Sequence, residues 1–424
     1  MQGIRRQSIG LLVVIGLTAA ACGGGASDGV GPSDPTTTTA DPVVMRDPPG
    51  SDHVESLAAG LSEAGFDVFS AVAASSTEDV IVSPLSIGLA FGMADVGATG
   101  ETATALEDLF GYPVDGEERW SAFNTLDQSV TDVGAPIVRL ANRMFPDESF
   151  DTVDGYEETL ARFFGTMVET LPLQRESENS RQRINEWVAD RTEDLIPDLL
   201  PTGAIDSQTV LLLVNALYLE ADWARPFGKY PTEDARFTLL DGTEVTVPMM
   251  HERELSGPAV VTDAYAATEI PYEGGVLSML VIVPEQGRFE EVQAEFSNDL
   301  VSEIDDTATT GNVELFLPRF ESATHLDLRS LLEEDLGVDG LFDIAGGWDG
   351  IAPGIFLESA VHAADISVDE YGTVAAAATA LNFEESGPPE ADVVVRADRP
   401  FLYLIRHTQT GAVLFVGRVV DPSS

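Results

Sequence analysis

Five histidines, many serines and a large number of carboxylates give this sequence the side chains that acid–base and nucleophilic catalysis use. The histidines are His53, His251, His325, His362 and His407. No Gly-x-Ser-x-Gly elbow joins a strand pattern to a helix pattern, and no His-x-x-x-His or Cys-x-x-Cys pair has the spacing of metal ligands. No Gly-x-x-x-x-Gly-Lys loop is present to cradle phosphate. The sequence therefore predicts no enzyme, no metal site and no cofactor.

Four polar residues stand out because their neighbours are apolar. Asn215 interrupts a long apolar run, and His362 lies among small apolar residues of another strand candidate. Ser83 and Ser86 begin an apolar helical stretch. Because a buried amide or imidazole without a partner is costly, each should be hydrogen-bonded, either locally or to one another.

A glycine, Gly372, opens a run of side chains no larger than valine. The run is Thr373, Val374, Ala375, Ala376, Ala377, Ala378 and Thr379. One interpretation is an alanine-rich helix, since alanine has the highest helix propensity. The other is a segment whose side chains are small enough to enter the middle of an existing sheet as a strand.

The elements that must position these residues follow from hydrophobic periodicity. Apolar residues at helical spacing begin at Val54, and residues 210–219 are apolar almost throughout, as expected of a central strand covered on both faces. Further strand candidates are 277–283, 313–317, 356–368, 401–405 and 412–420. Helices mostly precede strands, which predicts an α+β fold.

The net charge of -50 is extreme, because 72 acidic residues face 22 basic ones. This charge repels phosphate backbones and sulfated polysaccharides, so we expect neither nucleic-acid nor heparin binding. A solvated acidic surface is the simplest interpretation, and an acidic docking face is the alternative. We expect a monomer.

Cys22 is the only cysteine, so no intramolecular disulfide can form. Basic residues Arg5 and Arg6 precede an apolar core at residues 9–17, and three alanines stand directly before Cys22. This pattern resembles a bacterial lipoprotein signal, in which cleavage before the cysteine leaves its thiol acylated. An ordinary secretory signal is the alternative.

The chain is therefore expected to divide into three parts. Residues 1–21 form the signal peptide, and residues 22–52, rich in Gly, Ser, Pro, Thr and Asp, form a flexible tether. Residues 53–424 form the folded domain. The expected location is extracytoplasmic, lipid-anchored to the bacterial cell membrane or secreted.

Short motifs follow one another along residues 53–422 in a fixed order. They are Val80-Ile-Val-Ser-Pro-Leu-Ser-Ile-Gly-Leu-Ala90, Gly97-Ala-Thr-Gly-Glu-Thr102, Ala141-Asn-Arg-Met-Phe145, Ile184-Asn-Glu-Trp-Val188, Asn215-Ala-Leu-Tyr-Leu-Glu-Ala-Asp-Trp223, Ile270-Pro-Tyr272, Leu277-Ser-Met-Leu280, Leu317-Pro-Arg-Phe320, Ala397-Asp-Arg-Pro-Phe401 and Leu414-Phe-Val-Gly-Arg418. Together and in this order they resemble the serpin family of serine protease inhibitors. The resemblance implies an α+β fold with three β-sheets, about eight or nine helices and an exposed reactive loop.

The resemblance also implies roles for the unusual residues. Ser83, Ser86, Asn215 and His362 match the family's shutter, a polar cluster beneath the large sheet where two central strands part. Trp223 matches the breach, the tryptophan at the top of that opening. The run from Gly372 to Thr379 matches the hinge of the reactive loop, which favours the strand interpretation over the helix.

By the same resemblance the protein is a suicide inhibitor: a serine protease cleaves the loop, forms an acyl-enzyme and is trapped when the hinge inserts into the sheet. Thr373, Ala375, Ala377 and Thr379 should face inward, and Val374 should face outward. The alternatives are a non-inhibitory serpin acting as a surface binding module and, less supported by motifs, a hydrolase.

The reactive bond follows from family spacing. Counting from Gly372 places it between Ser386 and Gly387, and a register one shorter places it between Glu385 and Ser386. These bonds suit an elastase-like, subtilisin-like or glutamate-specific protease, and Phe383 or Leu381 would suit a chymotrypsin-like one. No basic residue is near, so we expect no trypsin-like target.

Overall fold

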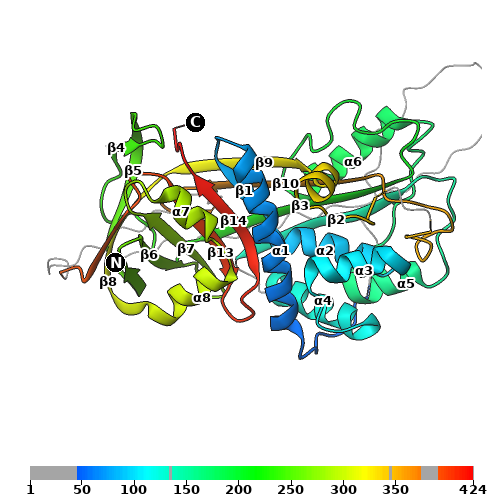
Figure 1. Ribbon diagram of the computed structural model, residues 1–424, viewed down its shortest axis with the longest axis horizontal. Helices are drawn as coiled ribbons and strands as arrows, with labels where there is room; N and C mark the ends of the chain where they lie inside the picture. Colours follow the sequence, from blue (N-terminus) through cyan, green and yellow to red (C-terminus); the bar gives the residue numbers. More distant parts are fainter. Residues whose placement is uncertain (1–44, 133–135, 343–345, 374–389, 424) are drawn as a thin grey trace, which may run out of the picture. The chain divides into compact units, whose positions relative to one another are not determined.

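The computed structural model describes residues 45–132, 136–342, 346–373 and 390–423. Nine α-helices occur in these ranges, most of them before the main strands (Figure 1). The helices are α1 (Val54–Ser75), α2 (Pro84–Asp95), α3 (Gly100–Phe110), α4 (Gly116–Thr131), α5 (Tyr156–Phe164), α6 (Ser177–Arg191), α7 (Phe289–Ala294), α8 (Asn298–Thr307) and α9 (Leu328–Ser330), which continues into a π-helical turn, η1 (Leu331–Asp335). The expected α+β fold is confirmed.

The central sheet consists of strands far apart in the sequence. Its order is β2 (Ile137–Pro146), β3 (Leu211–Asp222), β11 (Gly372–Thr373), β10 (Ser359–Val368) and β9 (Phe320–Asp327), and β3 also pairs directly with β10. Figure 1 shows α6 on one side of this sheet and α2 on the other.

The remaining strands form one continuous sheet, where the family resemblance implied two. Its order is β1 (Val80–Val82), β14 (Val413–Val419), β13 (Phe401–His407), β7 (Leu277–Pro284), β6 (Tyr265–Pro271), β5 (Glu244–Val261), β8 (Thr309–Pro318) and β12 (Val393–Arg396), and β4 (Glu233–Thr238) pairs with β5. The long strand β5 joins the two parts, because it pairs with β4 at one end, with β8 along its middle and with β6 at the other end.

Strand β3 is apolar on both faces because each face packs against a different layer. Leu211, Leu213 and Leu217 belong to the main hydrophobic core on the α2 side. Leu212 and Val214 belong to a second cluster, beneath α6. Alternating side chains thus enter two cores, which explains why the sequence shows a continuous apolar run.

Helix α1 is the one helix of the described ranges whose length and composition would allow it to cross a membrane. Its side chains Leu57, Leu61 and Phe69 are buried in the main core. The helix therefore serves as a core helix of the folded domain.

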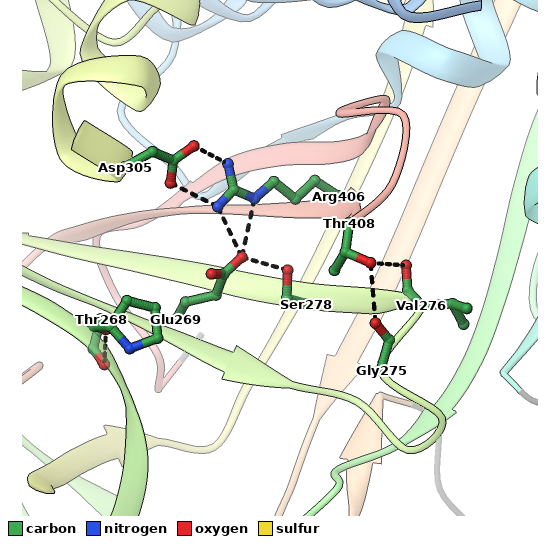
Figure 2. Close-up of polar contacts among 9 residues, drawn as sticks. Thr268, Glu269, Gly275, Val276, Ser278, Asp305, Arg406 and Thr408 are labelled. Carbon is green, nitrogen blue, oxygen red and sulfur yellow. Dashed lines mark hydrogen bonds and ion pairs between the residues drawn. The ribbon is translucent and has the colours of Figure 1, made fainter. Parts of the chain in front are cut away.

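A partly buried ion-pair network ties helix α8 to the second sheet (Figure 2). Arg406 of β13 donates to both carboxylate oxygens of Asp305 of α8, at 2.6 and 2.7 Å. The same guanidinium donates to Glu269 of β6, which also accepts from the hydroxyl of Ser278 of β7 at 2.5 Å. The network thereby links three strands and a helix.

Candidate functional site

The site is the place in the central sheet where β3 and β10 separate, which we call the gap. Its lower end is where their pairing stops, at Leu217 and Ala364, and its upper end is where β11 lies. The two strands pair in parallel along residues 212–217 and 359–364 and then separate. Above the separation β11 lies between them, with Thr373 opposite Ala221 of β3 and Val368 of β10. Both of these pairings are antiparallel. The first residues of a third strand therefore already occupy the upper end of the gap.

The four polar residues singled out in the sequence lie together below the gap. The Ser83 N–H donates to Nε2 of His362 at 3.1 Å, and the Ser86 N–H donates to Oγ of Ser83 at 3.3 Å. Nδ2 of Asn215 donates to the carbonyl oxygen and to Oγ of Ser86, at 2.5 and 2.6 Å. Oδ1 of Asn215 accepts from Nδ1 of His362, and this bond joins β3 to β10.

The environment of His362 determines its protonation state. Burial, with a smaller contribution from His325, lowers the pKa of His362 to about 3, so the imidazole is neutral at physiological pH. Because Nε2 accepts from the Ser83 N–H, the proton lies on Nδ1 and is donated to Asn215. Protonation of Nε2 would place a donor opposite the Ser83 N–H and break this contact.

Asn142 of β2 completes the polar cluster, and the sequence analysis missed it. Its Oδ1 accepts from Nδ2 of Asn215 at 2.7 Å. In the strand register Asn142 lies opposite Asn215, and Asn215 lies opposite His362, so three polar side chains form a row across three strands. An amide among the apolar residues at the end of β2 was the signal that could have revealed it.

The neighbouring row, on the opposite face of the sheet, consists of alanines. Ala141 of β2 lies opposite Ala216 of β3, which lies opposite Ala363 of β10. All three are fully buried in the cluster beneath α6, together with Trp187 and Val188 of that helix. Below the gap the sheet therefore carries one polar row among apolar side chains on the α2 side, next to a row of small side chains on the α6 side.

Trp223 lies at the upper end of the gap and holds the segment that leads into β11. Its ring stacks on Tyr272 with centroids 4.4 Å apart, and its Nε1–H donates to the carbonyl oxygen of Asp369 at 2.9 Å. The Trp223 N–H donates to the carbonyl oxygen of Tyr371 at 2.7 Å. The hydroxyls of Tyr272 and Thr373 are 2.7 Å apart. Burial raises the pKa of Tyr272, so its phenol stays protonated and hydrogen-bonded to the hydroxyl of Thr373.

Glu370 fixes the turn before β11. Its carboxylate accepts from Nε and Nη2 of Arg319, at 2.8 and 2.6 Å, and from the hydroxyl of Thr232. Burial raises the pKa of Glu370, but these donors outweigh burial and the net pKa lies below its usual range. Two residues later, Gly372 lies so close to the backbone of β3 that only glycine fits. A Cβ there would lie 2.0 Å from the carbonyl oxygen of Ala221.

The structure thus brings together Ser83, Ser86, Asn215 and His362 at one end of the gap, and Trp223, Gly372 and Thr373 at the other. Sequence reasoning gave no role to Tyr272 or Arg319, although both lie in quoted motifs. The remaining predicted site residues lie outside the described residues. They are Cys22, Val374, Ala375, Ala376, Ala377, Ala378, Thr379, Glu385, Ser386 and Gly387.

Comparison with known proteins identifies the family. Residues 59–422 match the family model "Serpin (serine protease inhibitor)". The chain belongs to the serpin family.

Named relatives share about a third of their residues with this chain. The human leukocyte elastase inhibitor is 32% identical over 385 residues, which cover 87% of this chain and 100% of the relative. An uncharacterized serpin-like protein of Thermococcus kodakarensis is 32% identical over 363 residues, covering 84% of each chain. The crystal structure of Manduca sexta serine protease inhibitor (serpin)-12 matches with a TM-score of 0.76 at 22% identity, over 86% of this chain and 99% of that one. This last likeness shows a shared fold.

The buried neutral state of His362 predicts a specific loss of stability in acid. The unfolded histidine binds a proton near its usual pKa of 6.5, whereas the folded one binds it only near 3. The stability contributed by neutral His362 is therefore complete above pH 6.5 and is lost as the pH falls toward 3, at about 1.4 kcal/mol per pH unit.

Thermal midpoints of the wild type and His362→Asn between pH 7.5 and 4.5 test this expectation. The variant should be less stable at neutral pH, but its thermal midpoint should fall less steeply than that of the wild type as the pH decreases. His53→Asn, at the start of α1 and away from the cluster, is the matched control and should follow the wild type. Equal slopes for the wild type and His362→Asn would contradict the assignment.

Proposed function

We propose that this protein is a suicide inhibitor of serine proteases that acts by strand insertion into the central sheet. The position of β11 is the observation that carries the proposal, since Thr373 already lies between β3 and β10. The residues after Thr373 are the small ones that the sequence assigns to the hinge. Further insertion would extend a strand that has already begun.

In the proposed reaction the catalytic serine of the protease attacks a peptide bond of the loop and forms an acyl-enzyme, releasing the new amino terminus. The cut allows the segment after Thr373 to extend β11 through the gap. The protease is carried with it, and its active site is distorted before water hydrolyses the ester. The inhibitor is consumed, so the reaction is not enzymatic turnover.

Strand geometry supplies a driving force for this step. Below the gap, β3 and β10 share one parallel ladder of six residue pairs. A strand inserted between them, antiparallel to both as β11 is, would form two ladders in place of one. Antiparallel pairs are also slightly more stable per residue than parallel pairs. The cleaved and inserted form should therefore be more stable than the intact form.

The polar cluster would act as the releasable shutter of the sheet. Separating β10 from β3 breaks the bond between His362 and Asn215, a neutral hydrogen bond of the kind worth about 0.5–1.5 kcal/mol net. Asn142 and Asn215 lie on paired strands and remain together when β3 moves with β2. The shutter therefore resists opening without preventing it.

The proposed reactive bond is Ser386–Gly387, with Glu385–Ser386 as the alternative. Relatives at 32% identity are named leukocyte elastase inhibitors, which supports an elastase among the targets. The lipid anchor at Cys22 is proposed from the sequence pattern, and would hold the inhibitor at the outer surface of the cell membrane.

Incubation with a panel of serine proteases tests the proposed function. The chain from residue 22 carrying Cys22→Ser should form an SDS-resistant complex with leukocyte elastase, subtilisin, chymotrypsin or glutamyl endopeptidase. Loop cleavage should also raise the thermal midpoint markedly, because the sheet gains a strand. Cleavage by every protease without a complex, and with an unchanged midpoint, would reject inhibition in favour of a non-inhibitory binding module.

Thr373→Arg tests the register of insertion. A charge where Thr373 now contacts Tyr272 carries a burial penalty, so insertion should be slowed. The variant should be cleaved as a substrate, with complex formation reduced at least about tenfold, a change in barrier near 1.4 kcal/mol. Val374→Arg, predicted to face outward, is the matched control and should still form complexes. Efficient complex formation by Thr373→Arg would refute the register.

Mass spectrometry of the mature N-terminus tests the anchor. Expressed with its own signal in a bacterium, the chain should begin at Cys22 and carry an acylated thiol. A mature chain with an unmodified cysteine, or one that begins elsewhere, would reject the lipoprotein proposal and leave the inhibitory function untouched.

A further inference from the structure

Residues 46–51, which composition assigned to the flexible tether, lie bonded across helices α4 and α5. We call this segment the strap. Its Arg46 side chain makes three polar contacts: Nε with Oδ1 of Asn124 at 3.1 Å, Nη1 with the carboxylate of Asp127 at 2.5 Å, and Nη2 with the carbonyl oxygen of Phe163 at 3.0 Å. One guanidinium therefore bridges α4, which holds Asn124 and Asp127, and α5, which holds Phe163.

Asp47 repeats this bridge. Its N–H donates to the carbonyl oxygen of Arg162 at 2.8 Å, and its carboxylate accepts from the Arg162 guanidinium at 3.0 Å. Its carbonyl oxygen accepts from the side-chain amides of Asn124 and Gln128, at 2.9 and 3.0 Å. Further along the strap, the N–H groups of residues 50 and 51 donate to Oγ1 of Thr125. Both helices are thus held by backbone and side-chain contacts.

The surface beneath the strap is built to receive it. Asp127 is buried, and a buried carboxylate needs a charged partner, which Arg46 supplies. Gly165, just after α5, has a φ of +63°, and a Cβ there would lie 2.5 Å from Cδ of Arg46. The missing side chain leaves room for the arginine stem. These features distinguish the strap from a peptide resting on a surface.

The strap bridges the two helices between which β2 lies in the chain. Helix α4 ends at Thr131 before β2 begins at Ile137, and β2 ends at Pro146 before α5 begins at Tyr156. Strand β2 pairs with β3 along its whole length. For β3 to move away from β10, β2 must move with it, and the helices at both ends of β2 must adjust relative to each other.

We propose that the strap is a brake on opening of the central sheet: by fastening α4 to α5 it restrains β2 and β3, and so slows insertion of a strand between β3 and β10. In the sequence the strap lies after the proposed anchor residue Cys22 and directly before helix α1. This inference rests on the proposed insertion mechanism, and its test uses no protease.

The test measures uptake into the gap of a synthetic peptide with the sequence of residues 374–385, since Thr373 already occupies its upper end. Uptake is followed by native electrophoresis and by the rise in thermal midpoint. Arg46→Met keeps the aliphatic stem and removes the ion pair and its hydrogen bonds. It should accelerate peptide uptake about fivefold, the effect of lowering the barrier by roughly 1 kcal/mol. Thr125→Val removes the contacts to residues 50 and 51, and should accelerate uptake by a smaller factor.

Arg406→Met is the matched control, because Arg406 is also a partly buried arginine, and it forms two ion pairs in the other sheet where Arg46 forms one (Figure 2). It should lower the thermal midpoint but leave the uptake rate within about twofold of the wild type. If the strap variants take up peptide no faster than Arg406→Met, general destabilisation explains the result and the brake is refuted. If no variant and no wild-type protein takes up peptide, the insertion mechanism itself fails, and the brake with it.

Discussion

The parallel pairing of β3 with β10, which stops at Leu217 and Ala364, is the constraint on which the rest of the structure depends. Below that point the backbone ladder and the bond between Asn215 and His362 hold the strands together. Above it, β11 lies between them. One sheet thus contains a closed part and an open part. Neither part changes alone, because the same two strands run through both.

The surroundings of the gap can be understood from this division. At the closed end a row of polar side chains is buried, apart from the half-buried Asn142, and each member has a hydrogen-bond partner. The row therefore costs little and specifies a single register. At the open end the chain is held by Trp223, Tyr272 and the carboxylate of Glu370. These contacts position Thr373 between the two strands. Among the described residues, the next stretch of each strand pairs only with its outer neighbour, β3 with β2 and β10 with β9.

The sequence allowed the main features of the fold to be predicted wherever local pattern determines structure. Local pattern predicts the apolar strand β3 and the helix that begins near Val54. It also reveals the motifs that carry Ser83, Ser86, Asn215 and His362. The residues that these side chains contact across the sheet could not be predicted. Asn142 and Tyr272 act through contacts with residues far away in the chain, and no spacing rule connects them with Asn215 or Thr373.

Composition gave a wrong expectation for the strap, and the family resemblance implied three sheets where the described strands pair in two. The strap belongs to a segment poor in apolar residues, yet Arg46 is held by the buried carboxylate of Asp127, a contact that only the folded domain creates. The joining of two expected sheets into one depends on how far β5 continues past the bulge between Glu252 and Leu255, and local propensity does not fix that length.

The row of alanines beneath α6 has a mechanical consequence. Close-packed layers interlock because ridges of one enter grooves of the other, and interlocked layers cannot slide without first separating. Ala141, Ala216 and Ala363 present a nearly level surface to the helix at the level where β3 and β10 would move apart. In the proposed insertion, the small side chains would let the strands slide beneath α6 with little interlocking, while α6 keeps them covered from water.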